Sequence, residues 1–243
     1  KAEFISLSNN KISDISAFEA NDGLRTLELA NNNVVDISAL KDCFNISSLN
    51  LSGNQITDIS ALATIDSLNI LDLSSNLISD ITPLSQNTNY VNTDTAIHLE
   101  NNKISDISSL TAFKNADYFL LRNNLIEDVS PLASCSAIEW ADIRNNKVSD
   151  LSTLSGAPKL RKVFAVGNPI TNISGLRLVS GEMITEKSIL SVTYTDQIDW
   201  AQAKSLNIND IRVYDIPPRQ RAAMDDLGYR TNYDSSTQED TDE

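Results

Sequence analysis

One short pattern of apolar and polar positions, L-x-x-N-x-I-x-D-I-S-x-L, recurs eight times along the chain. Each copy opens on two apolar residues that one residue separates, and this period-two spacing predicts a short strand with one buried face. The pairs are Ile5/Leu7, Leu27/Leu29, Leu49/Leu51, Leu71/Leu73, Ile97/Leu99, Phe119/Leu121, Ala141/Ile143 and Val163/Ala165. The asparagines that follow them are Asn10, Asn32, Asn54, Asn76, Asn102, Asn124, Asn146 and Asn168. Successive asparagines lie 22 residues apart, with one interval of 26, so we expect a solenoid of stacked units with one long parallel sheet.

The polar positions of the pattern are expected to be structural. An asparagine amide has both donors and an acceptor, so it can bond backbone groups at the bend that follows each strand. The D-I-S triplet suits a tight turn or the cap of a short helical turn, because aspartate oxygens accept backbone N–H bonds. A ladder of aspartates is also a candidate calcium site, but one aspartate per repeat lacks the clustered oxygen ligands that calcium requires.

Composition restricts the partners. The formal net charge of −14 and the isoelectric point near 4.4 argue against nucleic acid and against anionic membrane surfaces, which both attract basic proteins. No run of 18 apolar residues exists, so no membrane insertion is expected. Cys43 and Cys135 occupy equivalent positions four repeats apart, roughly 19 Å at the usual strand spacing, so we predict buried thiols that form no disulfide.

Catalytic and metal-binding motifs are not found. The nucleophile-elbow, phosphate-loop and zinc-protease patterns are absent, and His98 has no second histidine or cysteine in a ligand pattern. We therefore predict no enzyme activity, no cofactor and no metal. An enzyme would need its chemistry in residues 177–233.

The phrases LSGNQITDISAL and LSSNLISDITPL closely resemble the repeats of bacterial internalins, within the 22-residue class of leucine-rich repeats. The regulatory subunit of protein phosphatase type one is a more distant likeness. The resemblance covers residues 1–176. It implies an α/β leucine-rich repeat solenoid, with a curved parallel sheet on the concave side and short 3₁₀ turns on the convex side. It also implies a module that binds a protein partner.

The residues beside the apolar pairs are predicted to face the concave side, and they differ between the two halves of the solenoid. The first four repeats offer small, polar and weakly acidic residues there. The last four gather the aromatic and basic types that dominate interface hot spots. The predicted partner-binding residues are Tyr118, Trp140, Phe164, Arg122, Arg144, Lys162, His98 and Leu120. Tyr118, Trp140 and Phe164 would supply apolar anchors, and Arg122, Arg144 and Lys162 would meet acidic groups of the partner. Packing within the sheet and a small-molecule site are the alternatives.

Three further segments follow from the pattern. The interval of 26 places four extra residues within 85–95, where we expect a loop that leaves the strands undisturbed. Residues 1–176 form the predicted solenoid of eight repeats, which begins inside a repeat, so a cap or signal peptide is expected upstream.

Residues 177–233 are predicted to form a C-terminal α/β cap, with an immunoglobulin-like module as the alternative. The cap would contain a strand at 188–195, a helix at 198–206, a strand at 210–217 and a helix that Gly228 ends. Residues 234–243 are acidic and are expected to be a disordered tail or linker.

These expectations lead to one functional hypothesis and one rival. The chain would be a monomeric, non-catalytic module on the bacterial surface or outside the cell, which binds a protein such as a host or cell-surface protein. The rival is a cytoplasmic regulatory or scaffold subunit, similar to the phosphatase regulators.

Overall fold

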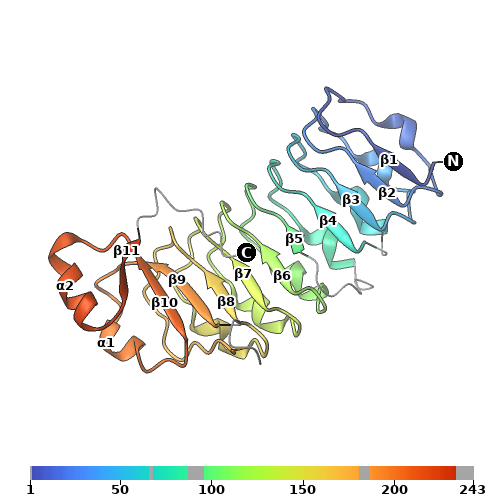
Figure 1. Ribbon diagram of the computed structural model, residues 1–243. Helices are drawn as coiled ribbons and strands as arrows, with labels where there is room; N and C mark the ends of the chain where they lie inside the picture. Colours follow the sequence, from blue (N-terminus) through green and yellow to red (C-terminus); the bar gives the residue numbers. More distant parts are fainter. Residues whose placement is uncertain (1, 66–67, 87–95, 181–186, 234–243) are drawn as a thin grey trace.

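A computed structural model describes residues 2–65, 68–86, 96–180 and 187–233. Eleven strands form one sheet in which every strand pairs in parallel with its neighbours in chain order (Figure 1). The strands are β1 (Phe4–Ser6), β2 (Thr26–Glu28), β3 (Ser48–Asn50), β4 (Ile70–Asp72), β5 (Ala96–His98), β6 (Tyr118–Leu120), β7 (Trp140–Asp142), β8 (Lys162–Phe164), β9 (Ile189–Thr193), β10 (Asp210–Tyr214) and β11 (Arg230–Tyr233). The predicted α/β leucine-rich repeat solenoid is therefore confirmed.

The apolar pairs form the core between the sheet and the opposite side of the solenoid. From the second repeat onward both members of each pair are fully buried, as Leu27, Leu29, Phe119 and Leu121 illustrate. In the first repeat, Ile5 and Leu7 are only partly buried because no described repeat packs on their outer side.

From the second repeat to the eighth, the asparagine that follows the strand joins two repeats. In the sixth repeat, the Asn124 side-chain N–H group donates to the carbonyls of Leu99 and Leu121 at 2.9 and 3.0 Å. Its side-chain oxygen accepts the backbone N–H of Ile104 at 3.0 Å. Equivalent bonds recur at Asn32, Asn54, Asn76, Asn102, Asn146 and Asn168. The amide thus satisfies backbone groups of its own turn and of the preceding one, as expected.

The buried asparagines form one ladder of stacked side chains along the solenoid. The residues directly before them form a second, outer ladder and have a left-handed backbone conformation. Asn123 and Asn145 have φ values of 58° and 54°, and Asn145 donates to the side-chain oxygen of Asn123 at 2.8 Å. Gly53 interrupts this ladder and Gly167 ends it, because glycine has no side chain to continue the bonds. A Cβ atom at these positions would lie 2.3 and 2.1 Å from the neighbouring asparagine oxygen. This outer ladder is exposed, so it contributes less than the buried one.

Among the described residues, the D-I-S triplets and their variants start seven 3₁₀ helices on the side opposite the sheet. In each, the aspartate accepts the backbone N–H of the residue two positions later, at 2.8 Å for Asp106 and Ser108. The helices are η1 (Ser16–Phe18), η2 (Ser38–Leu40), η3 (Ser60–Thr64), η4 (Thr82–Gln86), η5 (Ser108–Ala112), η6 (Ser130–Ser134) and η7 (Ser152–Gly156). Bonds to Ser16, Ser38, Thr82 and Ser108 lower the pKa of Asp14, Asp36, Asp80 and Asp106 below the ordinary 3.8, since they favour the ionised carboxylate.

The four-residue insertion does not disturb the sheet. Leu71 and Asp72 of β4 pair with Ile97 and His98 of β5, so the strands on both sides keep the common register. The predicted loop itself lies largely outside the described residues, which resume at Ala96.

The segment after the eighth repeat continues the same sheet. The predicted strands appear as β9 and β10, and the predicted helices as α1 (Trp200–Ala203) and α2 (Pro218–Asp226). Gly228, with φ of 76°, follows α2 as expected. The parallel order of β8 to β11 rules out the immunoglobulin-like alternative for the described part of this segment. The boundary at residue 176 stays a prediction, and the predicted acidic tail lies outside the described residues.

Cys43 and Cys135 are buried thiols, as predicted. Burial raises the pKa of Cys135 to about 11. In the described parts of the chain, no helix has the length and apolar character needed to cross a membrane.

We expect Asn124→Ala to lower the free energy of unfolding by about 2 kcal/mol, because the buried N–H of Ile104 loses its partner at about 1–3 kcal/mol. The carbonyls of Leu99 and Leu121 each keep a second asparagine donor, from Asn102 and Asn146. Asn123→Gly is the matched control. Glycine already occupies the equivalent left-handed position at Gly53 and Gly167, so a change below about 1 kcal/mol is expected. Urea denaturation followed by circular dichroism measures both. An equal loss in the two variants would contradict the role given to the buried ladder.

Acid should destabilise the solenoid partly through the aspartate turns. Their folded pKa lies below the ordinary 3.8, so their contribution is fully present above about pH 4 and is lost as the pH falls through the lowered pKa. Replacing Asp14, Asp36, Asp80 and Asp106 together by Asn keeps the acceptor, as Asn172 demonstrates with Ser174 N at 2.9 Å. We expect this variant to lose stability less steeply between about pH 4 and pH 2 in urea titrations. Identical slopes for the two proteins would disprove the assignment.

Candidate functional site

The exposed face of the sheet, which we call the strand face, presents three columns of side chains. Register places Tyr118, Trp140 and Lys162 side by side in the first column. The second column runs from His98 through Leu120 and Asp142 to Phe164. The third contains Glu100, Arg122, Arg144 and Val166, two residues beyond the strands, where backbone bonds continue the pairing. The structure therefore brings all eight predicted partner-binding residues onto one face, over β5 to β8.

An aromatic cluster occupies the centre of this region. The Tyr118 and Trp140 rings meet edge to face with centroids 5.8 Å apart, and the Trp140 and Phe164 rings lie 5.3 Å apart. The Lys162 ammonium lies 4.8 Å from the centroid of the Trp140 ring, within cation–π range. Tyr118 and Trp140 are half-buried, so part of each ring remains accessible.

Phe164 does not present the surface that the sequence predicted. Its side chain is only 1% exposed, so the prediction that it offers an apolar anchor directly to a partner is wrong. It lies between Asp142 and Ser191 in the second column and packs against Trp140. Phe164 is buried because the sheet continues into β9, which places Ser191 directly beside it. Phe164 is therefore a support for Trp140.

Arg122 and Arg144 differ in whether a carboxylate of the chain neutralises their charge. Arg144 donates to both carboxylate oxygens of Asp142 at 2.9 and 2.7 Å, and its guanidinium lies 5.8 Å from the Phe164 ring centroid. Its charge is thus compensated within the chain, which corrects the prediction that it meets acidic groups of a partner. Arg122 is exposed and forms no ion pair within the described part of the chain, so it keeps that predicted role.

His98 lies in an acidic environment at the edge of the aromatic cluster. Its Nδ1 atom is 3.4 Å from Glu100 Oε1, and Asp72 is its neighbour on β4. The bond to Glu100 raises the pKa of His98 above the ordinary 6.5, against the opposing effect of burial. Leu120, its neighbour on β6, is uncharged.

On the strand face, the first four repeats expose two large apolar residues, although the sequence predicted small, polar and weakly acidic residues on this part of the face. Phe4 is 62% exposed and Ile70 47%, both in the first column. They are separated by Thr26 and Ser48, so they form no continuous patch.

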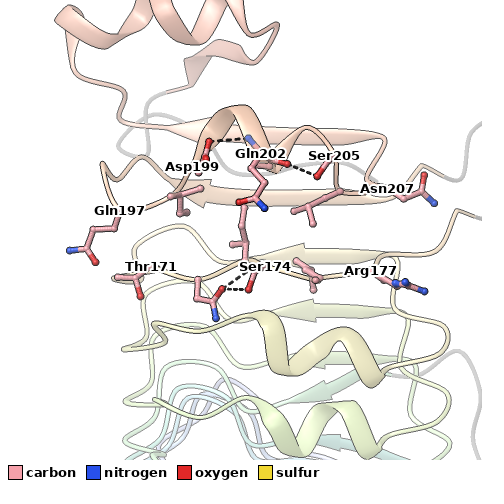
Figure 2. A pocket seen from close by; sticks show the side chains of 15 residues that line it. Thr171, Ser174, Arg177, Gln197, Asp199, Gln202, Ser205 and Asn207 are labelled. Atoms are coloured by element: carbon pink, nitrogen blue, oxygen red, sulfur yellow. Dashed lines mark hydrogen bonds between the residues drawn. The ribbon is translucent and has the colours of Figure 1, made fainter.

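A pocket of about 600 Å³ opens on the side opposite the sheet, where the sequence predicted nothing. It lies between residues 171–177 and α1, with Ser174 and Gln202 facing each other across it (Figure 2). No 3₁₀ helix follows the triplet Asn172–Ser174, and this interruption of the helical stack leaves the space. The sequence signal for this interruption was Gly175, which directly follows the triplet and has a left-handed φ of 71°.

The described lining of this pocket is mostly polar and uncharged. Its described lining contains neither histidine nor cysteine, and its one carboxylate, Asp199, accepts the backbone N–H of Gln202 at the start of α1. In the described chain no three His, Cys, Asp or Glu side chains are placed to hold a metal ion.

Comparison with known proteins adds a family context. The family model for leucine rich repeats (2 copies) matches residues 3–42 and 45–86. Internalin C2 of Listeria monocytogenes is 32% identical, over 79% of this chain and 80% of that one, with a TM-score of 0.67. Internalin F of the same organism is 25% identical, over 95% of this chain and 66% of that one, with a TM-score of 0.68. A leucine-rich repeat protein of Leptospira interrogans, 16% identical, shares the fold with a TM-score of 0.60. No curated protein sequence matches the chain.

We expect Glu100→Gln to bring the pKa of His98 down toward 6.5, because the bond to this carboxylate is the largest cause of its elevation. Asp72→Asn should lower that pKa less, since Asp72 acts only through its charge at a distance. His98 is the single histidine of the chain, so its imidazole proton resonances, followed by NMR against pH, report the value without assignment ambiguity. A larger effect from Asp72→Asn would refute this account of the shift.

Proposed function

Because the chain belongs to the internalin-type leucine-rich repeat proteins, we propose that it is a non-catalytic module that binds a protein partner through the strand face of repeats five to eight. The observation that carries the proposal is the cluster around Trp140. An aromatic pair remains partly accessible there, on a face that is otherwise lined mainly by small and polar residues.

The contacts of this cluster favour recognition by a rigid surface. Trp140 is held between Tyr118 and Phe164, with Lys162 over its ring. A side chain fixed in this way loses little conformational freedom when a partner covers it, which favours binding.

The remaining predicted residues divide by role. Tyr118 and Trp140 supply the apolar contact, and Leu120 extends it in the second column. Arg122 is the cation available to an acidic group of the partner. Phe164 and Arg144 act indirectly, through Trp140 and Asp142.

The kinship with internalins supports a place on a bacterial surface or outside the cell, and a host or cell-surface protein as the partner. A cytoplasmic regulatory or scaffold subunit is the second candidate, favoured by the likeness of the repeats to those of phosphatase regulators. A monomer is the expected form in both cases.

The double variant Tyr118→Ala, Trp140→Ala should abolish partner binding, because such aromatic anchors are each worth about 2 kcal/mol or more. The partner is first isolated on the immobilised chain and identified by mass spectrometry, and its affinity for each variant is then measured by calorimetry. Ile70→Ala is the matched control, since it removes an exposed apolar side chain from the same column, two repeats from Tyr118 and three from Trp140. Both proteins should show unchanged circular dichroism. Unchanged affinity in the double variant would place the site elsewhere.

A further inference from the structure

Glu100 is an acidic residue whose hydrogen-bonding capacity is only half used. One carboxylate oxygen lies 3.4 Å from His98 Nδ1, while the other, Oε2, is buried and has no hydrogen-bond partner. The residue as a whole is 8% exposed. A buried carboxylate oxygen without a donor is costly, so its position requires an explanation.

The surroundings of Glu100 have an excess of negative charge. Asp72 lies beside His98 in the second column, so two carboxylates face one imidazole. Arg122 is the neighbour of Glu100 in the third column, but the two side chains form no ion pair. The described residues here do not meet the requirement for a metal site.

Two cations on the same face, Arg144 and Lys162, contact groups other than Glu100. Arg144 is paired with both oxygens of Asp142, and Lys162 lies over Trp140. Neither therefore supplies the donor that Glu100 lacks. The unmet need on this part of the face is for a positively charged donor, placed one strand away from Tyr118.

We propose that Asp72, His98 and Glu100 form a subsite for a cationic side chain of the partner, with arginine as the best fit. This inference rests on the proposed function, because it assumes that a partner covers the strand face. A guanidinium group carries several N–H donors in a planar fork, so it can bond the Glu100 carboxylate, after a rotation of that side chain exposes Oε2, while it remains close to Asp72. The aliphatic stem of the arginine would lie along Leu120, which is half-buried in the same column as His98.

The subsite is tested with small probes, independently of any natural partner. N-acetyl-arginine amide is titrated into the intact protein while the imidazole resonances of His98, the only histidine, are followed by NMR. We expect a saturable shift. N-acetyl-citrulline amide has nearly the same shape without the charge, so it should produce no saturable shift.

Glu100→Gln should weaken the arginine probe about tenfold or more, as expected for loss of a hydrogen bond to a charged group. Glu28→Gln is the matched control, because it removes the same charge from the same face three strands away, where Glu28 instead accepts a bond from Ser6. If Glu100→Gln fails to fold, Asp72→Asn replaces it and should also weaken the probe. Equal saturation by citrulline, or equal affinity in Glu100→Gln and Glu28→Gln, would overturn the subsite.

This outcome is separable from that of the proposed function. Loss of partner binding in the Tyr118 and Trp140 variant, without saturation by arginine, would leave the strand face as the binding surface and remove the cation subsite. Saturation by arginine together with unchanged partner binding in that variant would retain the subsite and move the main interface.

Discussion

Backbone hydrogen bonding by the buried asparagines is the constraint on which the solenoid depends. Each amide joins carbonyls of two successive turns and accepts an N–H from the earlier one, so neighbouring repeats cannot slide past each other without leaving buried groups unpaired. The strands therefore share one register from β1 to β8, even across the interval of 26 residues. Columns of side chains on the strand face follow from this register.

Within those columns, function depends on which groups are already satisfied by their neighbours. Arg144 and Asp142 neutralise each other, and Phe164 is buried against Trp140, so these residues organise the surface. The indole N–H of Trp140 and the Glu100 oxygen Oε2 are buried without partners. They are buried polar atoms whose hydrogen-bonding capacity the described residues leave unused, which costs stability.

The C-terminal segment completes this arrangement. Strands β9 to β11 extend the sheet past the last asparagine, and the rung on β9 lies beside Phe164. On the opposite side, the stack of 3₁₀ helices ends at η7, and α1 lies across a pocket from residues 171–177 (Figure 2). The residues that end the repeat thus also help to hold the aromatic cluster in place.

The sequence by itself determined the solenoid, the strand positions, the turn chemistry and the eight residues of the candidate face, because each follows from local periodicity that repeats in register. It also predicted two strands and two helices of the C-terminal segment from their apolar spacing and from Gly228, but not the last strand, β11. Only the tertiary structure decided that Phe164 is buried, that Arg144 pairs with Asp142 and that Glu100 retains an unbonded oxygen. The burial of Phe164 depends on Trp140 of the neighbouring strand and on the strand added after the last repeat. The contacts of Arg144 with Asp142 and of Glu100 with His98 join residues two positions apart, where periodicity specifies the shared face but not the side-chain conformations.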